Sequence, residues 1–293
     1  MLELSTFSGI VGVGALLSLS LLPAQLEAQK LWERPVVVEK AETAAGAVKR
    51  TIEYGEDPEQ KLDLYLPAPS PSAKPWPAAV FVHGGPVPAG MSAKNIEQFQ
   101  SYGRVLSSRG IAAVAFNHRF HGLTDILQAA ADIDRALGYL RQHAAEYSID
   151  RDRLCVWTVS AGGLFAGPLL HQPPTYLRCL VMYYGLTDPE VFAQMGMGQP
   201  PSETSIRFRV ADQLRPESGP LPILVARAGK DSPALNRALD GFVERAVSLN
   251  LPIQLLNHPD GVHAFDVLDP NPRSVEIVEV TIAFVRRHLG LNP

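Results

Sequence analysis

LCVWTVSAGG, residues 154–163, is the stretch that decides the fold of this chain. An apolar run stops there at Ser160 and passes straight into the small residues 161–163. A buried strand followed by a tight turn into a helix would lift the serine oxygen above the edge of a sheet. The pattern matches the G-x-S-x-G nucleophile elbow, except that Thr158 replaces the first glycine. Serine among small residues also occurs in ordinary turns, so other segments have to decide between the two interpretations.

A second apolar strand, residues 77–82, runs into the tetrapeptide HGGP at residues 83–86. Glycine in such a loop lets main-chain N–H groups approach the negative charge that develops on a carbonyl oxygen under attack. Pro86 has no N–H to donate. The predicted oxyanion donors are therefore the N–H groups of Gly85 and Ala161. The rest of this predicted oxyanion loop consists of His83 and Gly84.

Two later strand ends supply an acid and a base. The apolar run 221–226 ends shortly before Asp231, and the short run 252–256 leads to His263 in the loop before the last helix. The order along the chain is Ser160, Asp231, His263. This order differs from the orders in chymotrypsin-like and subtilisin-like proteases, and it is the order of α/β-hydrolases.

Other residues of these loops compete for the same roles. His258 and Asp260 lie in the same loop as His263 and are its rivals as base and acid. Asp231 has the alternative of capping the next helix. The pair Ser232-Pro233 already suits the N-cap and first position of that helix, which leaves the Asp231 carboxylate for His263.

With these motifs, the chain resembles α/β-hydrolases of the esterase/lipase and dienelactone-hydrolase-like group from about residue 45 onward. KLDLYLP at 61–67 resembles the second strand of this group, and YSIDRDRL at 147–154 resembles its lead into the nucleophile strand. The resemblance implies a cofactor-free serine hydrolase of small carboxylic esters that forms an acyl-enzyme. It implies Ser160 as nucleophile, His263 as general base and then acid, and Asp231 as the group that orients the imidazole.

The alternation of strands and helices predicts an α/β fold with a mostly parallel, doubly wound sheet and helices on both faces. Residues 47–54 and 61–66 are expected to open the sheet as an antiparallel pair. Ser92 and Thr124 are the expected caps of the first two helices, and residues 29–293 are expected to form one domain.

The interval 185–220 holds Met195, Met197 and Phe208. In the resembled family this interval often forms a cap, and flexible methionines suit an adaptable apolar wall of an acyl pocket. These three residues are therefore the predicted substrate-binding residues. The alternative is a surface excursion with a small core of its own.

Composition and the N-terminus bear on partners and location. The chain has 293 residues, 46% of them hydrophobic, and a net charge of −4 without a basic run, which argues against nucleic acid as a partner. Residues 7–22 are apolar but shorter than the ~20 residues of a spanning helix. Residues 1–28 therefore predict a signal peptide and an exported protein, periplasmic or secreted. The positive charge usual at its start is missing, so an uncleaved membrane anchor and a cytoplasmic protein remain alternatives.

Two further residue pairs were weighed for other chemistry. His118 and His121 follow a strand end and are three positions apart, but no third metal ligand is evident, so we expect rim residues and no metal. Cys155 and Cys179 fall on neighbouring strands, where buried free thiols are favoured over a disulfide bond.

Three functions remain open on the sequence. The favoured one is a carboxylesterase. The second is a serine peptidase of the prolyl-oligopeptidase-like or iminopeptidase-like branch, where HGGP also precedes the nucleophile. The third is a non-catalytic binding protein on the same fold, which Ser160, Asp231 and His263 together argue against. Fold alone does not choose among them.

Overall fold

The computed structural model describes residues 33–40, 48–68, 75–87, 91–216, 219 and 221–292. The predicted export segment, residues 1–28, lies outside the described residues, and export stays a prediction. Within the described ranges, no helix combines the length and apolar character needed to cross a membrane.

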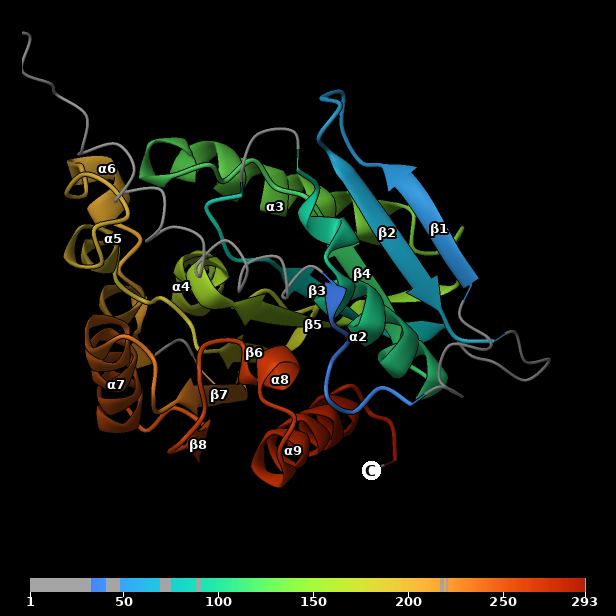
Figure 1. The fold of residues 1–293 in the computed structure, drawn as a ribbon. Helices are drawn as coiled ribbons and strands as arrows, with labels where there is room; N and C mark the ends of the chain where they lie inside the picture. Colours follow the sequence, from blue (N-terminus) through green and yellow to red (C-terminus); the bar gives the residue numbers. More distant parts are fainter. Residues whose placement is uncertain are drawn as a thin grey trace, which may run out of the picture.

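Eight strands form one sheet in the order β1-β2-β4-β3-β5-β6-β7-β8 (Figure 1). The strands are β1 (Val48–Glu53), β2 (Lys61–Leu66), β3 (Trp76–Val82), β4 (Ala112–Phe116), β5 (Ile149–Val159), β6 (Leu177–Tyr183), β7 (Ile223–Ala228) and β8 (Ile253–His258). β2 pairs antiparallel with both β1 and β4, and every other pairing is parallel. The predicted mostly parallel sheet with an opening antiparallel pair is confirmed.

Helices follow the strands in alternation. The longer ones are α2 (Glu97–Ser108), α3 (Ile126–Gln142), α7 (Pro233–Ser248) and α9 (Pro272–His288). The shorter ones are α4 (Ala166–His171), α5 (Glu190–Gln194), α6 (Glu203–Ile206) and α8 (Phe265–Leu268). Single 3-10 turns are η2 (Ala93–Asn95), η3 (Leu123–Asp125), η4 (Ser160–Phe165) and η5 (Val210–Gln213).

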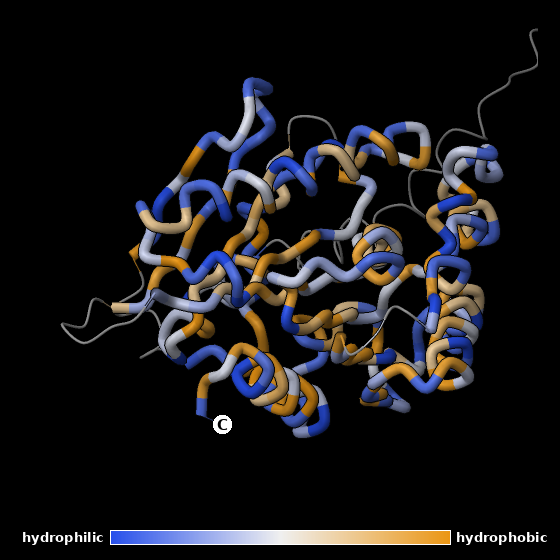
Figure 2. Tube along the Cα trace, turned by 180° about the vertical axis from the view of Figure 1, so that it is seen from behind, coloured by the Kyte–Doolittle hydropathy of each residue, from blue (hydrophilic) through white to orange (hydrophobic). Residues whose placement is uncertain are grey.

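The pleat of the sheet sends successive side chains of one strand to opposite faces. Along β3, Ala78 and Val80 enter one hydrophobic core, whereas Ala79 and Phe81 enter the other. The first core is covered by α3, α4 and α7, and the second by α2 and α9. In Figure 2 the apolar colour accordingly gathers on the central strands and on the inner sides of the helices.

Two helix starts differ from the sequence prediction. Ser92 precedes the 3-10 turn η2, and its hydroxyl donates to Oδ1 of Asn117 at 3.0 Å instead of capping a helix. Thr124 lies inside η3, and α3 begins two residues later at Ile126. Each hydroxyl has a side-chain partner outside the helix backbone, Asn117 for Ser92 and Asp125 for Thr124. Such competing partners explain why a cap residue predicts a helix start only approximately.

Six parallel strands, β3 to β8, end at one edge of the sheet. Their following loops hold the residues that the sequence singles out. Ser160 follows β5, Asp231 follows β7 and His263 follows β8, while the HGGP loop follows β3. The crevice outside the carboxyl ends of parallel strands is the usual place for ligands in open α/β sheets.

Candidate active site

Ser160 occupies the sharp turn between β5 and η4. Its φ is +52°, in the left-handed region that a non-glycine residue rarely adopts. A Cβ at Gly162 would lie 2.4 Å from the carbonyl oxygen of Val82, so only glycine lets the turn pass this close to β3. Such a constrained serine is the geometry of a nucleophile elbow.

Thr158 stands where the usual motif has glycine, and the structure shows why it is tolerated. Its side chain is fully buried inside β5 and its hydroxyl donates to the carbonyl oxygen of Val181 on β6 at 3.3 Å. The residue is extended strand, so it needs no glycine conformation. The conformational requirements of the elbow apply to Gly162 and to Ser160.

Ser160, His263 and Asp231 form one hydrogen-bonded chain. Nε2 of His263 lies 2.9 Å from Oγ of Ser160, and Nδ1 lies 2.6 Å from Oδ2 of Asp231. The other carboxylate oxygen of Asp231 accepts the N–H of Ser232 at 2.7 Å, which fixes the carboxylate plane. Because a carboxylate only accepts, Nδ1 of a neutral His263 carries the proton, which leaves Nε2 free to accept from the serine hydroxyl.

The rival residues of the loop have other partners. His258 is buried, with Nε2 at 3.1 Å from Oγ of Ser274. Asp260 pairs with Lys230 at 3.1 Å on the surface. The described contacts therefore join His263, and neither rival, to Ser160.

The HGGP loop lies against Ser160. A Cβ at Gly84 would stand 2.7 Å from Cβ and 3.2 Å from Oγ of Ser160, so the loop backbone passes directly beside the hydroxyl. Among the loop hydrogen bonds of the described residues, no backbone carbonyl accepts the N–H of Gly85 or that of Ala161. Ala161 begins a helical turn, where the first N–H groups have no partner within the helix. Both N–H groups therefore remain candidates for binding a negative oxygen.

The buried carboxyl group of Asp266 lies close to the His263 loop. Asp266 accepts hydrogen bonds from the hydroxyls of Tyr102 and Tyr184 and from Nε2 of Gln98, each at 2.8 Å. Burial raises the pKa of both tyrosines well above the usual value, which keeps their donor protons in place. The Tyr184 ring lies 4.7 Å from the His263 ring. Sequence motifs do not reveal this cluster, because its members come from three separate elements.

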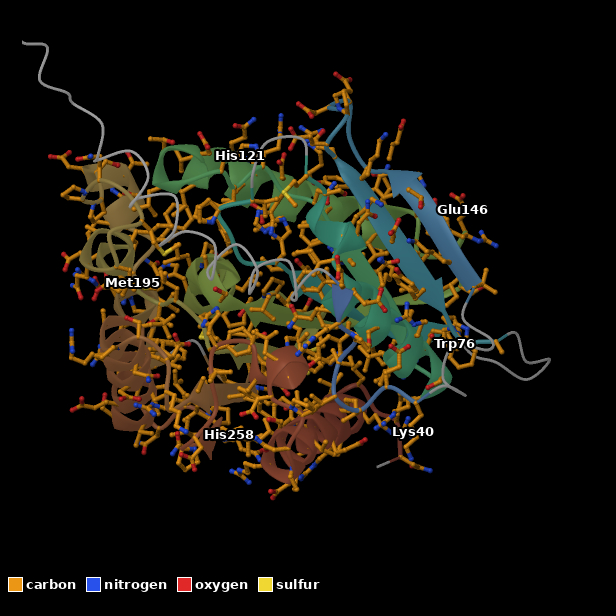
Figure 3. All side chains as sticks on the ribbon, viewed as in Figure 1. Lys40, Trp76, His121, Glu146, Met195 and His258 are labelled. Atoms are coloured by element: carbon orange, nitrogen blue, oxygen red, sulfur yellow. The ribbon has the colours of Figure 1, made fainter. Side chains whose placement is uncertain are left out.

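The predicted substrate-binding residues of the interval 185–220 fall into two environments. Met195 and Met197 are 39% and 45% exposed, and Met195 lies beside α5 at the margin of the molecule (Figure 3). Phe208 is buried, with its ring edge-on to Phe165 at 6.0 Å. Substrate binding by these residues stays a prediction.

The remaining singled-out residues are placed as follows. His118 is buried and not on the rim as predicted, because its ring stacks on His83, while His121 is partly exposed. The described residues contain no group of three or more acidic, histidine or cysteine side chains arranged for a metal. Cys155 and Cys179 oppose each other on β5 and β6 as buried free thiols.

Solved structures share this whole architecture. Esterase B from Lactobacillus rhamnosis superposes with a TM-score of 0.67 over 94% of this chain and 95% of that one, at 16% sequence identity. Thermogutta terrifontis esterase 2 phosphoramylated by tabun gives a TM-score of 0.62, with 85% and 97% covered, at 19% identity. The family model described as BD-FAE matches residues 62–169, which include the HGGP loop and the elbow. These structural matches show that the chain has the α/β-hydrolase fold.

Curated relatives match parts of the chain. The probable isoprenylcysteine alpha-carbonyl methylesterase ICMEL1 of Arabidopsis thaliana is 34% identical over 119 residues, which are 41% of this chain and 24% of that protein. Esterase LipC of Mycobacterium tuberculosis (strain ATCC 25618 / H37Rv) is 27% identical over 253 residues, which are 75% of this chain and 60% of that protein. The match to ICMEL1 thus spans about a quarter of the relative's length.

Proposed function

We propose that this chain hydrolyses small carboxylic esters through an acyl-enzyme on Ser160. The observation that carries the proposal is the continuous hydrogen-bonded path from Oγ of Ser160 through the His263 ring to Asp231. Similarity to proteins named as esterases and a methylesterase supports an ester as the substrate.

The proposed first half-reaction forms the acyl-enzyme. As Oγ of Ser160 attacks the ester carbonyl carbon, its proton moves to Nε2 of His263, and Asp231 stabilises the resulting imidazolium. The negative charge on the former carbonyl oxygen is stabilised by the N–H groups of Gly85 and Ala161. When the tetrahedral intermediate collapses, the bond to the alcohol oxygen breaks and that oxygen takes the proton from His263.

The proposed second half-reaction uses water in place of serine. His263 takes a proton from a water molecule while the water oxygen attacks the acyl carbon. Collapse breaks the bond to Oγ of Ser160, and His263 returns the proton to the serine. The carboxylic acid leaves, and the neutral imidazole is regenerated.

Replacing the serine tests the proposal most directly. Ser160→Ala should lower kcat on a short aryl ester by roughly 10⁴- to 10⁶-fold, because triad members act as a unit. It should also abolish labelling by a fluorophosphonate. Ser232→Ala is the matched control: it removes a hydroxyl at the same edge of the sheet that makes no helix-capping bond.

Two outcomes would overturn the assignment. One is a folded Ser160→Ala protein with the wild-type rate. The other is fluorophosphonate labelling on a different residue. An assay on aminoacyl amides beside the esters separates a peptidase from an esterase.

A further inference from the structure

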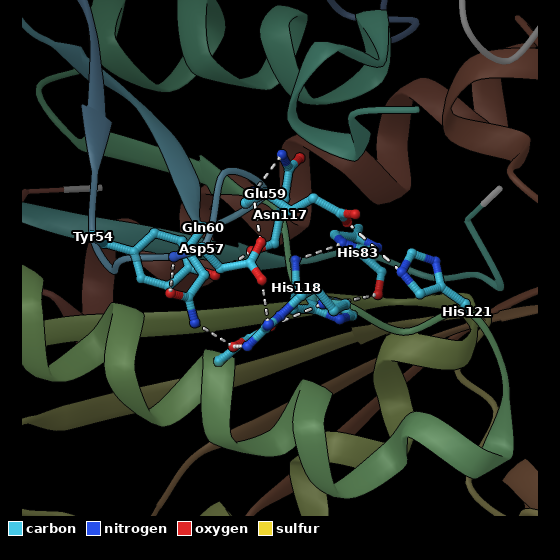
Figure 4. A network of polar contacts seen from close by, with 10 residues as sticks. Tyr54, Asp57, Glu59, Gln60, His83, Asn117, His118 and His121 are labelled. Atoms are coloured by element: carbon cyan, nitrogen blue, oxygen red, sulfur yellow. Dashed lines mark hydrogen bonds and ion pairs between the residues drawn. The ribbon is translucent and has the colours of Figure 1, made fainter. Parts of the chain in front are cut away.

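His83, the first residue of the HGGP loop, forms a buried pair with His118 (Figure 4). Their rings are stacked, with centroids 3.6 Å apart and planes only 5° from parallel. They meet because β3 and β4 are parallel neighbours in register, Phe81 opposite Ala115. His83 is the first residue after β3 and His118 is the second after β4, so both lie just beyond the same edge of the sheet. Neither side chain takes part in the proposed proton transfers.

Each ring has one tautomer that satisfies its contacts. Nε2 of His83 accepts the backbone N–H of His118 at 3.2 Å, so in the neutral ring Nδ1 carries the proton. That Nδ1 lies 2.5 Å from the carbonyl oxygen of Gly84, to which it donates. Nε2 of His118 in turn lies 3.2 Å from the carbonyl oxygen of His83 and donates to it.

These contacts determine how the peptide between Gly84 and Gly85 is turned. In a planar trans peptide the C=O and the N–H point in opposite directions. Because His83 holds the Gly84 carbonyl on its own side, the Gly85 N–H points away from the histidine pair. The close approach of Gly84 to Ser160 places this peptide beside the serine hydroxyl.

We propose that His118 is a positioning residue for ester hydrolysis: through its hydrogen bond to His83 and its stacked ring, it fixes the direction of the Gly85 N–H toward the oxyanion. The inference rests on the proposed esterase function. The Phe165 ring also packs edge-on against His118, with the ring centroids 5.3 Å apart. Its neighbour Arg119 is anchored to Asp132 of α3, by its backbone N–H at 3.0 Å and by its guanidinium at 2.7 Å and 2.8 Å.

Two substitutions separate the hydrogen bond from packing. His118→Phe keeps a stacked ring but removes the donor to the His83 carbonyl. His118→Gln places an amide donor near the position of Nε2 without a ring. Phe116→Leu is the control, because it disturbs the buried packing around His118, 5.9 Å from its ring, without touching His83. Should His118→Phe fail to fold, His118→Asn, whose shorter amide does not reach the same position, replaces it.

The readouts are kcat and KM on a short aryl ester, and Ki for a trifluoromethyl ketone, which forms a tetrahedral adduct with an active-site serine. A donor that is turned away rather than deleted should cost about 10- to 100-fold in kcat, less than the loss of a donor. We expect this loss for His118→Phe with KM nearly unchanged, an equal rise in Ki, and a substantial recovery of both in His118→Gln.

Three results would overturn the proposal: an unchanged kcat in folded His118→Phe, an equal loss in Phe116→Leu, or a kcat loss without a rise in Ki. A failure of the esterase proposal itself looks different, because the wild-type protein would then neither hydrolyse esters nor react with a fluorophosphonate.

Discussion

Two buried polar clusters lie near the loops beside Ser160, and they differ in the chemistry of their central groups. Under the His263 loop, three donors converge on the carboxyl group of Asp266. At the start of the HGGP loop, His83 and His118 meet as neutral rings that donate to backbone carbonyls. One side of the site is thus organised around an acidic group, and the other around uncharged rings.

Burial shifts the pKa values of both clusters, and it shifts them in opposite directions. It lowers the pKa of His83 to about 4 and that of His118 well below the usual value, so both rings are neutral at pH 7. It raises the pKa of the Asp266 carboxyl, against the lowering effect of its three hydrogen bonds. The same desolvation therefore favours the neutral form of each group, and this has opposite consequences for stability in acid.

The largest loss of rate is expected from changes on the His263 side of the site. Asp231→Asn should lower kcat by up to about 10⁴-fold while the fold is kept, because an amide favours the wrong tautomer of His263. Steady-state kinetics on an aryl ester, with circular dichroism to verify folding, measures this loss.

Asp260→Asn is the matched control for this prediction. Asp260 is exposed and pairs with Lys230, so its removal should leave kcat within about twofold, as for other surface ion pairs. Equal losses in both variants would contradict the assignment of Asp231 as the acid that orients His263.

On the oxyanion side, Gly84→Ala should lower kcat by about 10²- to 10³-fold. The added Cβ would stand 2.7 Å from Cβ of Ser160, so the loop must move and take the Gly85 N–H with it. Gly138→Ala is the control, because Gly138 lies on α3 with open space around it and alanine there favours the helix. A Gly84→Ala protein with wild-type kcat would show that the loop does not serve the reaction.

The smallest expected effect is on stability in acid. A histidine whose folded pKa lies below its unfolded value of about 6.5 binds fewer protons in the folded state than in the unfolded state. Its contribution to the free energy of unfolding is therefore complete above about pH 6.5 and is lost as the pH falls. For His83 this window runs from about 6.5 down to about 4. His121, which also lowers the pKa of both rings, remains in the variants.

Denaturant unfolding between pH 4.5 and 7 measures this effect. His118→Phe should reduce the slope of unfolding free energy against pH by about 1.4 kcal/mol per pH unit, the amount for one proton. Asp266→Asn should change the slope in the opposite direction, because a carboxyl whose folded pKa is raised contributes stability at low pH that is lost as pH rises through that pKa. If the slope of unfolding free energy against pH changed in the same direction in both variants, the two clusters would not have opposite effects on stability in acid.

Much of the site is readable from local sequence. The apolar run before Ser160, the glycines at 84 and 162, and the strand ends before Asp231 and His263 each carry a local signature. Strand periodicity and chain order then place these loops at one edge of a parallel sheet, since parallel strands point the same way. The same reasoning predicted the antiparallel opening pair, which the register Val48 opposite Leu66 confirms.

Only the tertiary structure decided which polar residues support that site. Asp266 lies on α8, Tyr184 directly follows β6 and Gln98 lies on α2, and no local pattern links these three residues. Because His118 follows a strand end, the sequence predicts a residue at the rim of the site, yet the parallel pairing of β3 and β4 buries its ring against His83. Local sequence determined where the reacting groups sit along the strands, because backbone propensity and strand alternation are local. Their supporting contacts depend on which strands become neighbours, and that depends on the packing of the whole sheet.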